Sequence, residues 1–248
     1  MQYYLYGIVW KGEEGTTGGP VKLLGQQREI EFIAPGDLGF LASQLEVEGQ
    51  LRASRRNVQK HSKILTDLLS KFGTLCPVSF GTVLDSRGKV IQLVEENYDE
   101  IEQTMVQIED QVEYGLKAYW DPDEVAGVIG EEDKEVRKFK SRLQKGDLED
   151  SYENTLRVGE LIEDKMDERR DILEEDVLDF LAPVTNQWQT GDLFDERMAV
   201  NFAFLLDRSD EKDFDRAMQE LGESQESYLT FNYNGPWPPF SFVDLEFE

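Results

Sequence analysis

The strongest constraint on the fold is the order of apolar segments and amphipathic helices within residues 113–233. Short segments rich in aromatic and β-branched residues, typical of buried strands, alternate with segments whose apolar residues recur every three or four positions. Strands are expected at 113–120, 184–189, 198–206 and 227–233, and helical segments at 121–181 and 210–222. The order β-α-β-β-α-β is the ferredoxin-like pattern. We therefore predict a modified ferredoxin-like domain over residues 112–233.

The first crossover of this domain is longer than the pattern requires. Residues 121–181 hold apolar positions at helical spacing, and Pro183 stops the last helix because proline has no backbone N–H. Gly130 and Gly146 interrupt the spacing. We expect inserted helices with breaks near these two glycines.

The first half of the chain is predicted to form a separate α+β domain over residues 1–111. Its expected elements are strands at 2–10, 28–33 and 74–84, a glycine-rich loop at 11–20, and a helix over 54–72. Pro77 favours an edge position or a bulge for the third strand, because proline cannot donate to a ladder. Ser86 can cap a second long helix, whose apolar stripe continues as far as Val112.

The last segment, residues 234–248, combines prolines with large apolar side chains. Three prolines remove backbone donors and favour an extended path. Trp237, Phe240 and Phe242 are too apolar to lie in water without a partner surface. We expect this tail to pack between the two domains and to clamp them together, or else to anchor a partner protein.

The charge of the chain limits its partners. The formal net charge is −26 and the sequence pI is about 4.3. Residues 1–112 hold 11 Lys+Arg against 16 Asp+Glu, whereas residues 113–248 hold 15 against 36. A field of this sign repels nucleic acid and an anionic membrane surface, so neither is an expected partner.

Cysteine usage and the N-terminus indicate the compartment. A single cysteine, Cys76, excludes a disulfide within the chain and fits a reducing cytosol. The first residues show no basic region followed by an apolar stretch, so no signal peptide is predicted. No apolar run approaches the roughly 20 residues that a membrane span needs. A cytoplasmic protein is expected.

Nucleophilic catalysis would depend on His61 and Cys76, the only histidine and the only cysteine. A catalytic pair needs an exposed thiolate and a third group that orients the histidine. His61 lies on the apolar stripe of the helix over 54–72, and Cys76 lies in an apolar strand. Both are predicted to be core residues, with His61 hydrogen bonded locally.

The sequence gives little support for a metal site or for a phosphate-binding loop. One histidine and one cysteine exclude the usual zinc ligand sets. Calcium or magnesium could be held by 207–215 or by Glu131, Glu132 and Asp133, but solvated acidic faces are the simpler interpretation. The glycines of the 11–20 loop lack the lysine of a phosphate-binding loop. No catalytic residue, cofactor or metal site is predicted.

A cluster of positive charge occupies the start of the predicted helix over 54–72. It consists of Arg52, Arg55, Arg56, Lys60 and Lys63. These side chains could dock an acidic partner or the acidic second half of the same chain. A pairing within the chain, or simple solvation, is the favoured interpretation.

Three segments resemble a known family. His61 followed by residues 75–83 (LCPVSFGTV), residues 112–120 (VEYGLKAYW) and residues 234–242 (NGPWPPFSF) are similar to ordered motifs of the gas vesicle protein F/L family, GvpF/GvpL. The resemblance is spread over most of the chain and is closest to GvpF. It implies a two-domain α+β protein with a modified ferredoxin-like second domain.

The resemblance also implies a function without catalytic residues. Such a protein is a minor structural component of gas vesicles or an accessory protein in their assembly. Its expected partners are the main shell protein, GvpA, and other gas vesicle accessory proteins. It would bind the apolar shell protein and limit its aggregation, with Trp237 and Phe240 as candidate contacts.

Two other functions remain open on the sequence. The excess of carboxylates would suit a carboxylate-dependent, metal-assisted hydrolase. A ferredoxin-like domain could also be a small-molecule sensor, although that hypothesis rests on fold analogy alone.

Overall fold

The computed structural model describes residues 1–11, 17–45, 51–145, 151–225 and 228–245. Contacts divide the chain into two units. The first unit comprises Met1–Tyr114, Leu205–Arg208 and the segment from Gly235 onward, and the second comprises Gly115–Phe204 and Ser209–Asn234. The sequence patterns predict a domain boundary after residue 111 and a separate tail over residues 234–248.

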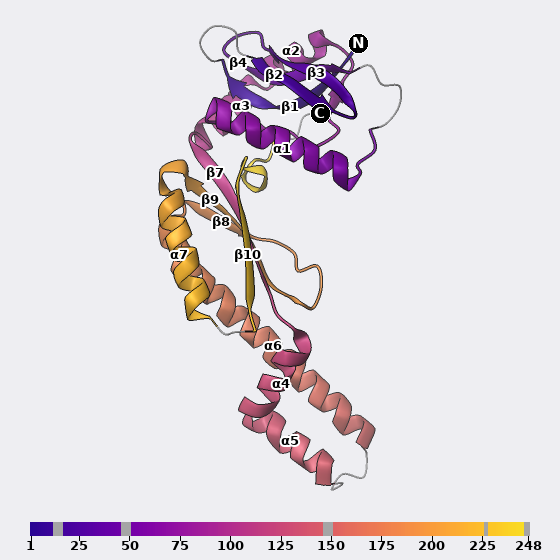
Figure 1. Cartoon of the computed structure of the whole chain (residues 1–248), viewed down its shortest axis with the longest axis vertical. Helices are drawn as coiled ribbons and strands as arrows, with labels where there is room; N and C mark the ends of the chain where they lie inside the picture. The colour runs from indigo at the N-terminus through magenta and orange to yellow at the C-terminus, as the bar shows by residue number, and fades with distance from the viewer. Residues whose placement is uncertain (12–16, 46–50, 146–150, 226–227, 246–248) are drawn as a thin grey trace. The chain divides into compact units, whose positions relative to one another are not determined.

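The first unit is a six-stranded sheet with helices on both faces (Figure 1). Its elements are β1 (Gln2–Trp10), β2 (Thr17–Leu23), β3 (Gln26–Ile33), β4 (Leu38–Leu45), α1 (Arg55–Phe72), β5 (Cys76–Pro77), β6 (Val83–Leu84), α2 (Arg87–Glu96) and α3 (Tyr98–Gln107). The strand order is β2-β3-β4-β1-β5, and β6 also pairs with β1. The described pairings in this sheet are antiparallel.

Strand β1 supplies side chains to both layers of this core. Tyr3, Leu5 and Ile8 join the core cluster that includes residues of α2 and α3. Tyr4 and Tyr6 contact His61 of α1 on the opposite face. The register with β4 shifts between Leu5 and Gly7, which accounts for the interval from Leu5 to Ile8.

Helix α1 confirms the prediction over 54–72. The side chain of Ser54 accepts from the backbone N–H of Asn57 at 3.3 Å and caps the N-terminus. Gly73, at φ 80°, ends the helix and donates its N–H to the carbonyl of Leu69. The buried face includes His61, Leu65 and Leu68, as the periodicity predicted.

The predicted single helix after Ser86 is wrong, because the chain forms two successive helices. Asn97 separates α2 from α3 with φ −119° and ψ 21°, and its side-chain amide donates to the carbonyl of Leu93 at 2.8 Å. The apolar stripe nevertheless continues through Val94, Ile101 and Met105, which are fully buried. A small break in the backbone therefore leaves the spacing of buried side chains almost unchanged.

Strands β2 and β4 of the first unit were not predicted. Residues 17–20 of the expected loop belong to β2, and residues 12–16 lie outside the described part of the chain. A Cβ at Gly18 would lie 2.5 Å from Ile30, so this glycine permits close packing within a strand. The predicted strand over 74–84 forms only the short β5 and β6, and β5 holds Pro77 at the sheet edge, as expected.

The second sheet and its helices carry the remaining elements. They are β7 (Gln111–Tyr119), α4 (Pro122–Glu132), α5 (Lys134–Lys145), α6 (Ser151–Leu181), β8 (Gln187–Thr190), β9 (Met198–Asp207), α7 (Glu211–Ser224) and β10 (Thr230–Trp237). Short 3-10 turns lie at Ala182–Val184, Arg208–Asp210 and Phe240–Phe242. The strand order is β10-β7-β9-β8.

This order confirms the ferredoxin-like pattern. The first and third strands, β7 and β9, lie at the centre, and β8 and β10 form the edges. The second strand starts at Gln187 instead of 184, because Ala182–Val184 forms a 3-10 turn. The last strand starts at Thr230, later than the predicted 227.

The long first crossover consists of three helices, as the inserted pattern predicted. Helix α4 ends at Glu132, so the chain breaks near Gly130 as expected, although Gly130 itself lies inside the helix. Asp133 makes the break, because its carboxylate accepts the backbone N–H groups of Glu135 and Val136 and caps α5. The second expected break, near Gly146, lies outside the described residues.

The core of the second unit is built from side chains of the strands and of the two long helices. Helix α6 packs against α7 and continues to α4 and α5 (Figure 1). Phe204 and Phe214 have ring centroids 5.8 Å apart and are fully buried. Val177 and Leu221 are also fully buried. Strand β8, by contrast, is exposed along its whole length.

Candidate partner-binding surfaces

The C-terminal segment is held by a buried carboxylate. Ser241, in the turn Phe240–Phe242, donates its backbone N–H to Glu113 Oε2 at 2.7 Å and its hydroxyl to Oε1 at 2.9 Å. Glu113 is 9% exposed, and burial raises its pKa, an effect that the two hydrogen bonds from Ser241 oppose. This contact joins residues 128 positions apart, from two of the segments that carried the family resemblance.

The same segment completes the core of the first unit. Val243 and Leu245 pack against the cluster formed by β1, β4, α2 and α3. The described contacts of residues 241–245 are therefore made with the first unit. The expected position of the tail between the two domains stays a prediction.

The three predicted contact residues have different surroundings. Trp237 ends β10, is half-buried and lines a groove beside α1. Phe240 is 38% exposed, and Phe242 is half-buried. The buried Pro238 and Pro239 lie between Trp237 and Phe240. Trp237 thus contributes to a concave surface.

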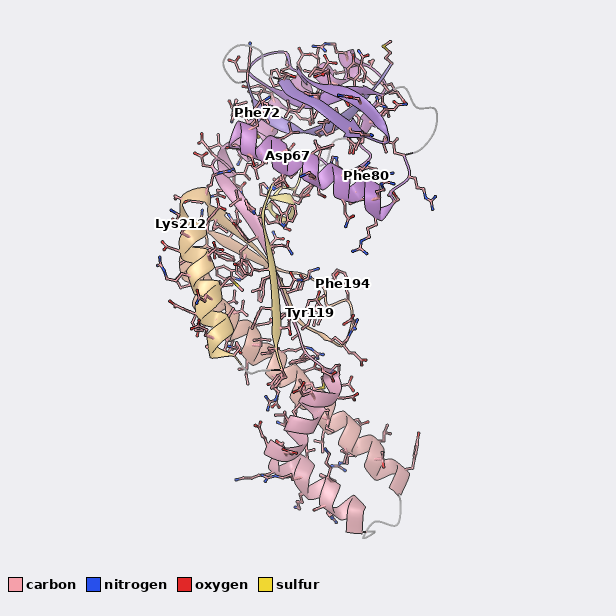
Figure 2. All side chains as sticks on the ribbon, in the orientation of Figure 1. Asp67, Phe72, Phe80, Tyr119, Phe194 and Lys212 are labelled. Carbon is pink, nitrogen blue, oxygen red and sulfur yellow. The ribbon has the colours of Figure 1, made fainter. Side chains whose placement is uncertain are left out.

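We name this concave surface the α1 groove. It has a volume of about 560 Å³ and is lined by Val58, Gln59, Ser62, Lys63, Thr66, Asp67 and Trp237. Asp67, one of these residues of α1, is labelled in Figure 2. Val58 lies three residues before His61, so helical spacing predicts a buried position, but its side chain is 39% exposed and lines the groove instead.

The hydroxyl groups of the α1 groove are satisfied within the helix. Ser62 donates to the carbonyl of Val58 at 3.2 Å, and Thr66 donates to the carbonyl of Ser62 at 3.0 Å. These donors are therefore used internally, and small side chains line the groove next to the indole of Trp237. A partner surface can approach closely here without leaving a buried hydroxyl unpaired.

The basic cluster begins at the N-terminus of α1. Arg55 and Arg56 are the first two residues of the helix, both exposed, and no acidic residue occupies its first turn. A helix N-terminus favours negative charge by about 0.3–1 kcal/mol per group, so two cations there are unfavourable. None of the cluster forms an ion pair within the described residues, so of the two expected alternatives the described residues agree with solvation and not with pairing within the chain.

A second basic helix was missed from the sequence. Helix α5 carries six basic residues against one acidic residue, Glu135. A shallow surface beside it is lined by Lys134, Arg137, Lys138, Lys140 and Ser141, with no apolar side chain among them. Asp133 and Glu135 place negative charge at the N-terminus of this helix, as its dipole favours.

Exposed apolar side chains gather on and after β8. Trp188 is 44% exposed, Leu193 is 42% exposed and Phe194 is 72% exposed. Lys117 Nζ lies 5.2 Å from the centroid of the Phe194 ring, which is labelled in Figure 2. The sequence predicted a strand over 184–189 and no element at Leu193 and Phe194. Periodicity therefore gave no sign that this pair would be exposed together with Trp188.

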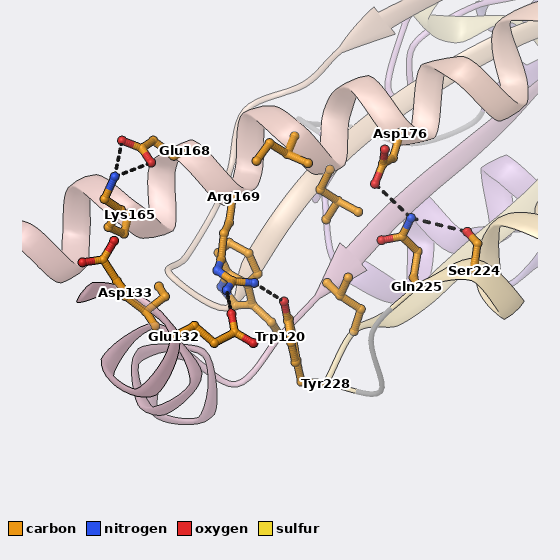
Figure 3. Close-up of a pocket in the computed structure, with 14 residues that line it drawn as sticks. Trp120, Glu132, Asp133, Lys165, Glu168, Arg169, Asp176, Ser224, Gln225 and Tyr228 are labelled. Atoms are coloured by element: carbon orange, nitrogen blue, oxygen red, sulfur yellow. Dashed lines mark hydrogen bonds and ion pairs between the residues drawn. The ribbon is translucent and has the colours of Figure 1, made fainter. Parts of the chain in front are cut away.

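A pocket of about 540 Å³ lies between α4, α6 and the start of β10 in the second unit (Figure 3). Arg169 points into it and donates to Tyr228 at 2.8 Å and to Glu132 at 2.6 Å. Hydrogen bonding from the N–H of Val136 lowers the pKa of Asp133, and hydrogen bonding to Glu168 raises the pKa of Lys165. Both shifts favour the charged forms, whereas an acid–base catalyst is tuned towards neutral pH.

His61 and Cys76 are core residues, as predicted. They are 2% and 1% exposed. Burial raises the pKa of the Cys76 thiol to about 12 and lowers the pKa of His61. The hydrogen bonds of His61 are not local, however. Its Nε2 donates to the carbonyl of Val78 at 2.8 Å, and its Nδ1 accepts from the hydroxyl of Tyr4 at 2.8 Å.

Three of the carboxylates considered as cation ligands have other roles in the structure. Asp213 pairs with Arg216, Asp215 accepts from Tyr233, and Asp133 caps α5. Within the described residues, no three His, Cys, Asp or Glu side chains are grouped so that they could hold a metal ion. In the same part of the chain, no helix has the length and apolar character needed to cross a membrane.

The fold and these surfaces define an α+β protein with a ferredoxin-like sheet, a sealed first core and several exposed apolar or basic surfaces. Residues 2–244 match the family described as gas vesicle synthesis protein GvpL/GvpF. The chain belongs to this family.

Individual relatives agree over almost the full length. The chain is 25% identical to gas vesicle protein F of Dolichospermum flosaquae, covering 98% of each chain. It is 28% identical to gas vesicle protein F1 of Halobacterium salinarum, covering 98% of this chain and 92% of that one. The crystal structure of GvpF from Anabaena sp. PCC7120 has the same fold, with a TM-score of 0.84, 24% identity and 99% of both chains covered. The fold of this chain is therefore the fold of that GvpF crystal structure.

Proposed function

We propose that this chain is an accessory component of gas vesicles that binds the main shell protein, GvpA, through apolar surface and limits its aggregation. Membership of the GvpL/GvpF family supports a role connected with gas vesicles. The binding of the shell protein is the further step, and it is argued from the surface of this molecule.

One observation carries the proposal. Trp188, Leu193 and Phe194 are exposed in a half of the chain that holds 15 Lys+Arg against 36 Asp+Glu. Apolar side chains can cover an apolar partner surface, while the surrounding charge resists association between the resulting complexes. A protein with this combination can bind a sparingly soluble partner and remain dispersed with it.

The proposal assigns no catalytic role to the chain. The single histidine and the single cysteine are buried, and Lys165, Arg169 and Asp133 of the pocket in Figure 3 are held in ion pairs or in a helix cap. A metal-assisted hydrolase would respond to its cation. We expect a titration with calcium or magnesium to leave the melting temperature unchanged, and a rise of several degrees would favour the hydrolase instead.

The test is co-purification with the shell protein. The full chain carries an affinity tag and is expressed together with GvpA, and the soluble fraction is analysed after capture. The proposal predicts that GvpA is enriched with the tagged chain and that more GvpA remains soluble than in its absence. Equal amounts of soluble GvpA with and without the chain would contradict the proposal.

A further inference from the structure

The basic end of α1 is electrostatically unfavourable within its own fold. Arg55 and Arg56 lie where the helix dipole favours anions, and Lys60 and Lys63 extend the same charge along the helix. The described residues offer no ion pair to any of these four. A chain with 52 acidic and 26 basic residues has ample means to neutralise such a site. Uncompensated charge of this kind is typical of functional surfaces.

The unfavourable charge adjoins the α1 groove. Val58 and Trp237 supply apolar surface, and the hydroxyls of Ser62 and Thr66 are bonded within the helix. Val58, Ser62 and Thr66 recur every four residues, so small side chains form one row along the helix. A row of this kind accepts the ridge of a second helix.

We propose that the α1 groove binds an amphipathic α-helix of a partner protein, antiparallel to α1. The apolar ridge of this helix packs against Val58 and Trp237. Acidic side chains near its C-terminal end face Arg55, Arg56 and Lys63. The antiparallel direction follows because the negative end of the partner helix then meets the positive end of α1. The inference deepens the proposed function and rests on it only for the identity of the protein that provides the helix.

Other ligands fit the α1 groove less well. Nucleic acid and anionic membranes meet the net charge of −26 beyond the basic end, whereas a short acidic helix makes only local contacts within one Debye length of about 8 Å. A free anion has no use for Val58 and Trp237. Helix α5 has cations but no apolar lining, and its dipole is already satisfied by Asp133. It therefore serves as the control surface.

The test uses two labelled helical peptides with identical leucine spacing, one with glutamate and one with lysine at the C-terminal end. Binding to the full chain is followed by fluorescence anisotropy. The wild-type protein should bind the glutamate peptide and not the lysine peptide. The double variant Arg55→Gln/Arg56→Gln should weaken binding by about fivefold, the effect of two exposed charge contacts. The matched variant Arg137→Gln/Lys138→Gln on α5 should leave it unchanged.

Two further variants test the groove itself. Ser62→Trp fills it, and Val58→Asp places a charge in its lining while favouring the helix dipole. Both should abolish peptide binding, with circular dichroism and melting temperature as checks of folding. Equal binding of both peptides, or undiminished binding by the two correctly folded variants, would overturn the inference.

Failure of the groove and failure of the proposed function give different results. If Ser62→Trp and Val58→Asp still retain GvpA but no longer bind the glutamate peptide, the α1 groove is not the site of the shell protein. The proposed function is then unaffected. A wild-type chain that binds the glutamate peptide but never retains GvpA supports the groove and contradicts the proposed function. Loss of both ligands from both variants supports the two together.

Discussion

The two units of this molecule bury the faces and edges of their sheets to different extents. In the first unit both faces of the sheet are covered, and the C-terminal segment adds Val243 and Leu245 to one of its cores. In the second sheet, β8 is an exposed edge that carries Trp188, and Leu193 and Phe194 follow it. The first half of the chain is also nearly balanced in charge, whereas the second is strongly acidic. The difference indicates that the second unit leaves more apolar side-chain surface open to a partner protein than the sheet of the first unit does.

The largest expected effect comes from the aromatic core of the second unit. Phe214→Ala should lower the free energy of unfolding by about 3–5 kcal/mol, because a fully buried ring is removed and a cavity remains. Urea denaturation followed by circular dichroism measures the change. Phe214→Leu, which retains most of the volume, should cost less than about 1.5 kcal/mol. Equal losses for both variants would show that this core is loosely packed.

The next largest effect concerns the polar centre of the first unit. His61→Ala leaves the Tyr4 hydroxyl and the Val78 carbonyl without this partner and should cost about 3 kcal/mol. Folding lowers the pKa of His61 below its ordinary value of 6.5 because the charged form is desolvated. The unfolded state therefore binds the proton first, and stability is lost as the pH falls through 6.5 towards the folded value.

This pH dependence distinguishes the core around His61 from the core around Phe214. The free energy of unfolding of the wild type should fall below pH 6.5 by a component that His61→Ala lacks and that Phe214→Ala retains. Parallel pH profiles for the wild type and His61→Ala would contradict the neutral, buried state of His61.

A smaller effect is expected from the hold on the C-terminal segment. Ser241→Ala removes the hydroxyl bond to Glu113 and should cost about 1.5–3 kcal/mol, as for a hydrogen bond to a charged group. Burial raises the pKa of Glu113 above its ordinary value of 4.5, so its contribution to stability is greatest below pH 4.5 and declines as the pH rises through the folded value. Glu113→Gln should lack this decline.

The control for this contact is Ser209→Ala, at an exposed serine that also lies in a 3-10 turn but whose hydroxyl donates to the side chain of the neighbouring Asp210 in an exposed hydrogen bond. It should leave the urea midpoint unchanged. A Ser241→Ala variant as stable as the wild type would show that the C-terminal segment is held by its apolar side chains alone.

The smallest effect on stability belongs to the exposed apolar side chains of the second unit. Trp188→Ser combined with Phe194→Ser should change the free energy of unfolding by less than about 1 kcal/mol, because exposed positions contribute little. The same variant should retain less GvpA in the capture assay. Val106→Ser, at a 61% exposed position of α3, is the matched control and should retain GvpA like the wild type.

Much of this fold could be predicted from periodicity. The order β7, α4–α6, β8, β9, α7, β10 follows from alternating apolar segments and amphipathic helices, and the buried face of α1 follows from residues spaced three or four apart. The positions at which helices are interrupted and strands begin were harder to predict. Asn97 interrupts a helix without disturbing its apolar stripe, and Gly18 lies in a strand at a position where a Cβ would come within 2.5 Å of Ile30.

The candidate surfaces were less predictable because they depend on distant contacts. The bonds between Ser241 and Glu113 join positions 128 apart, and no local pattern announces them. Trp237 was identified from its apolar character, but its position beside α1 needed the fold. Val58 shows the opposite limit. Its spacing matches the buried stripe, yet its side chain is 39% exposed and lines the α1 groove.

The most direct test of the account is hydroxyl-radical footprinting of the chain alone and in the presence of GvpA. The account predicts that oxidation of Trp237 and of Trp188 or Phe194 falls when GvpA is added, while exposed Tyr152 in α6 is oxidised equally in both samples. Unchanged oxidation at Trp188, Phe194 and Trp237 in a sample where GvpA is bound would contradict the claim that this protein acts through these apolar surfaces.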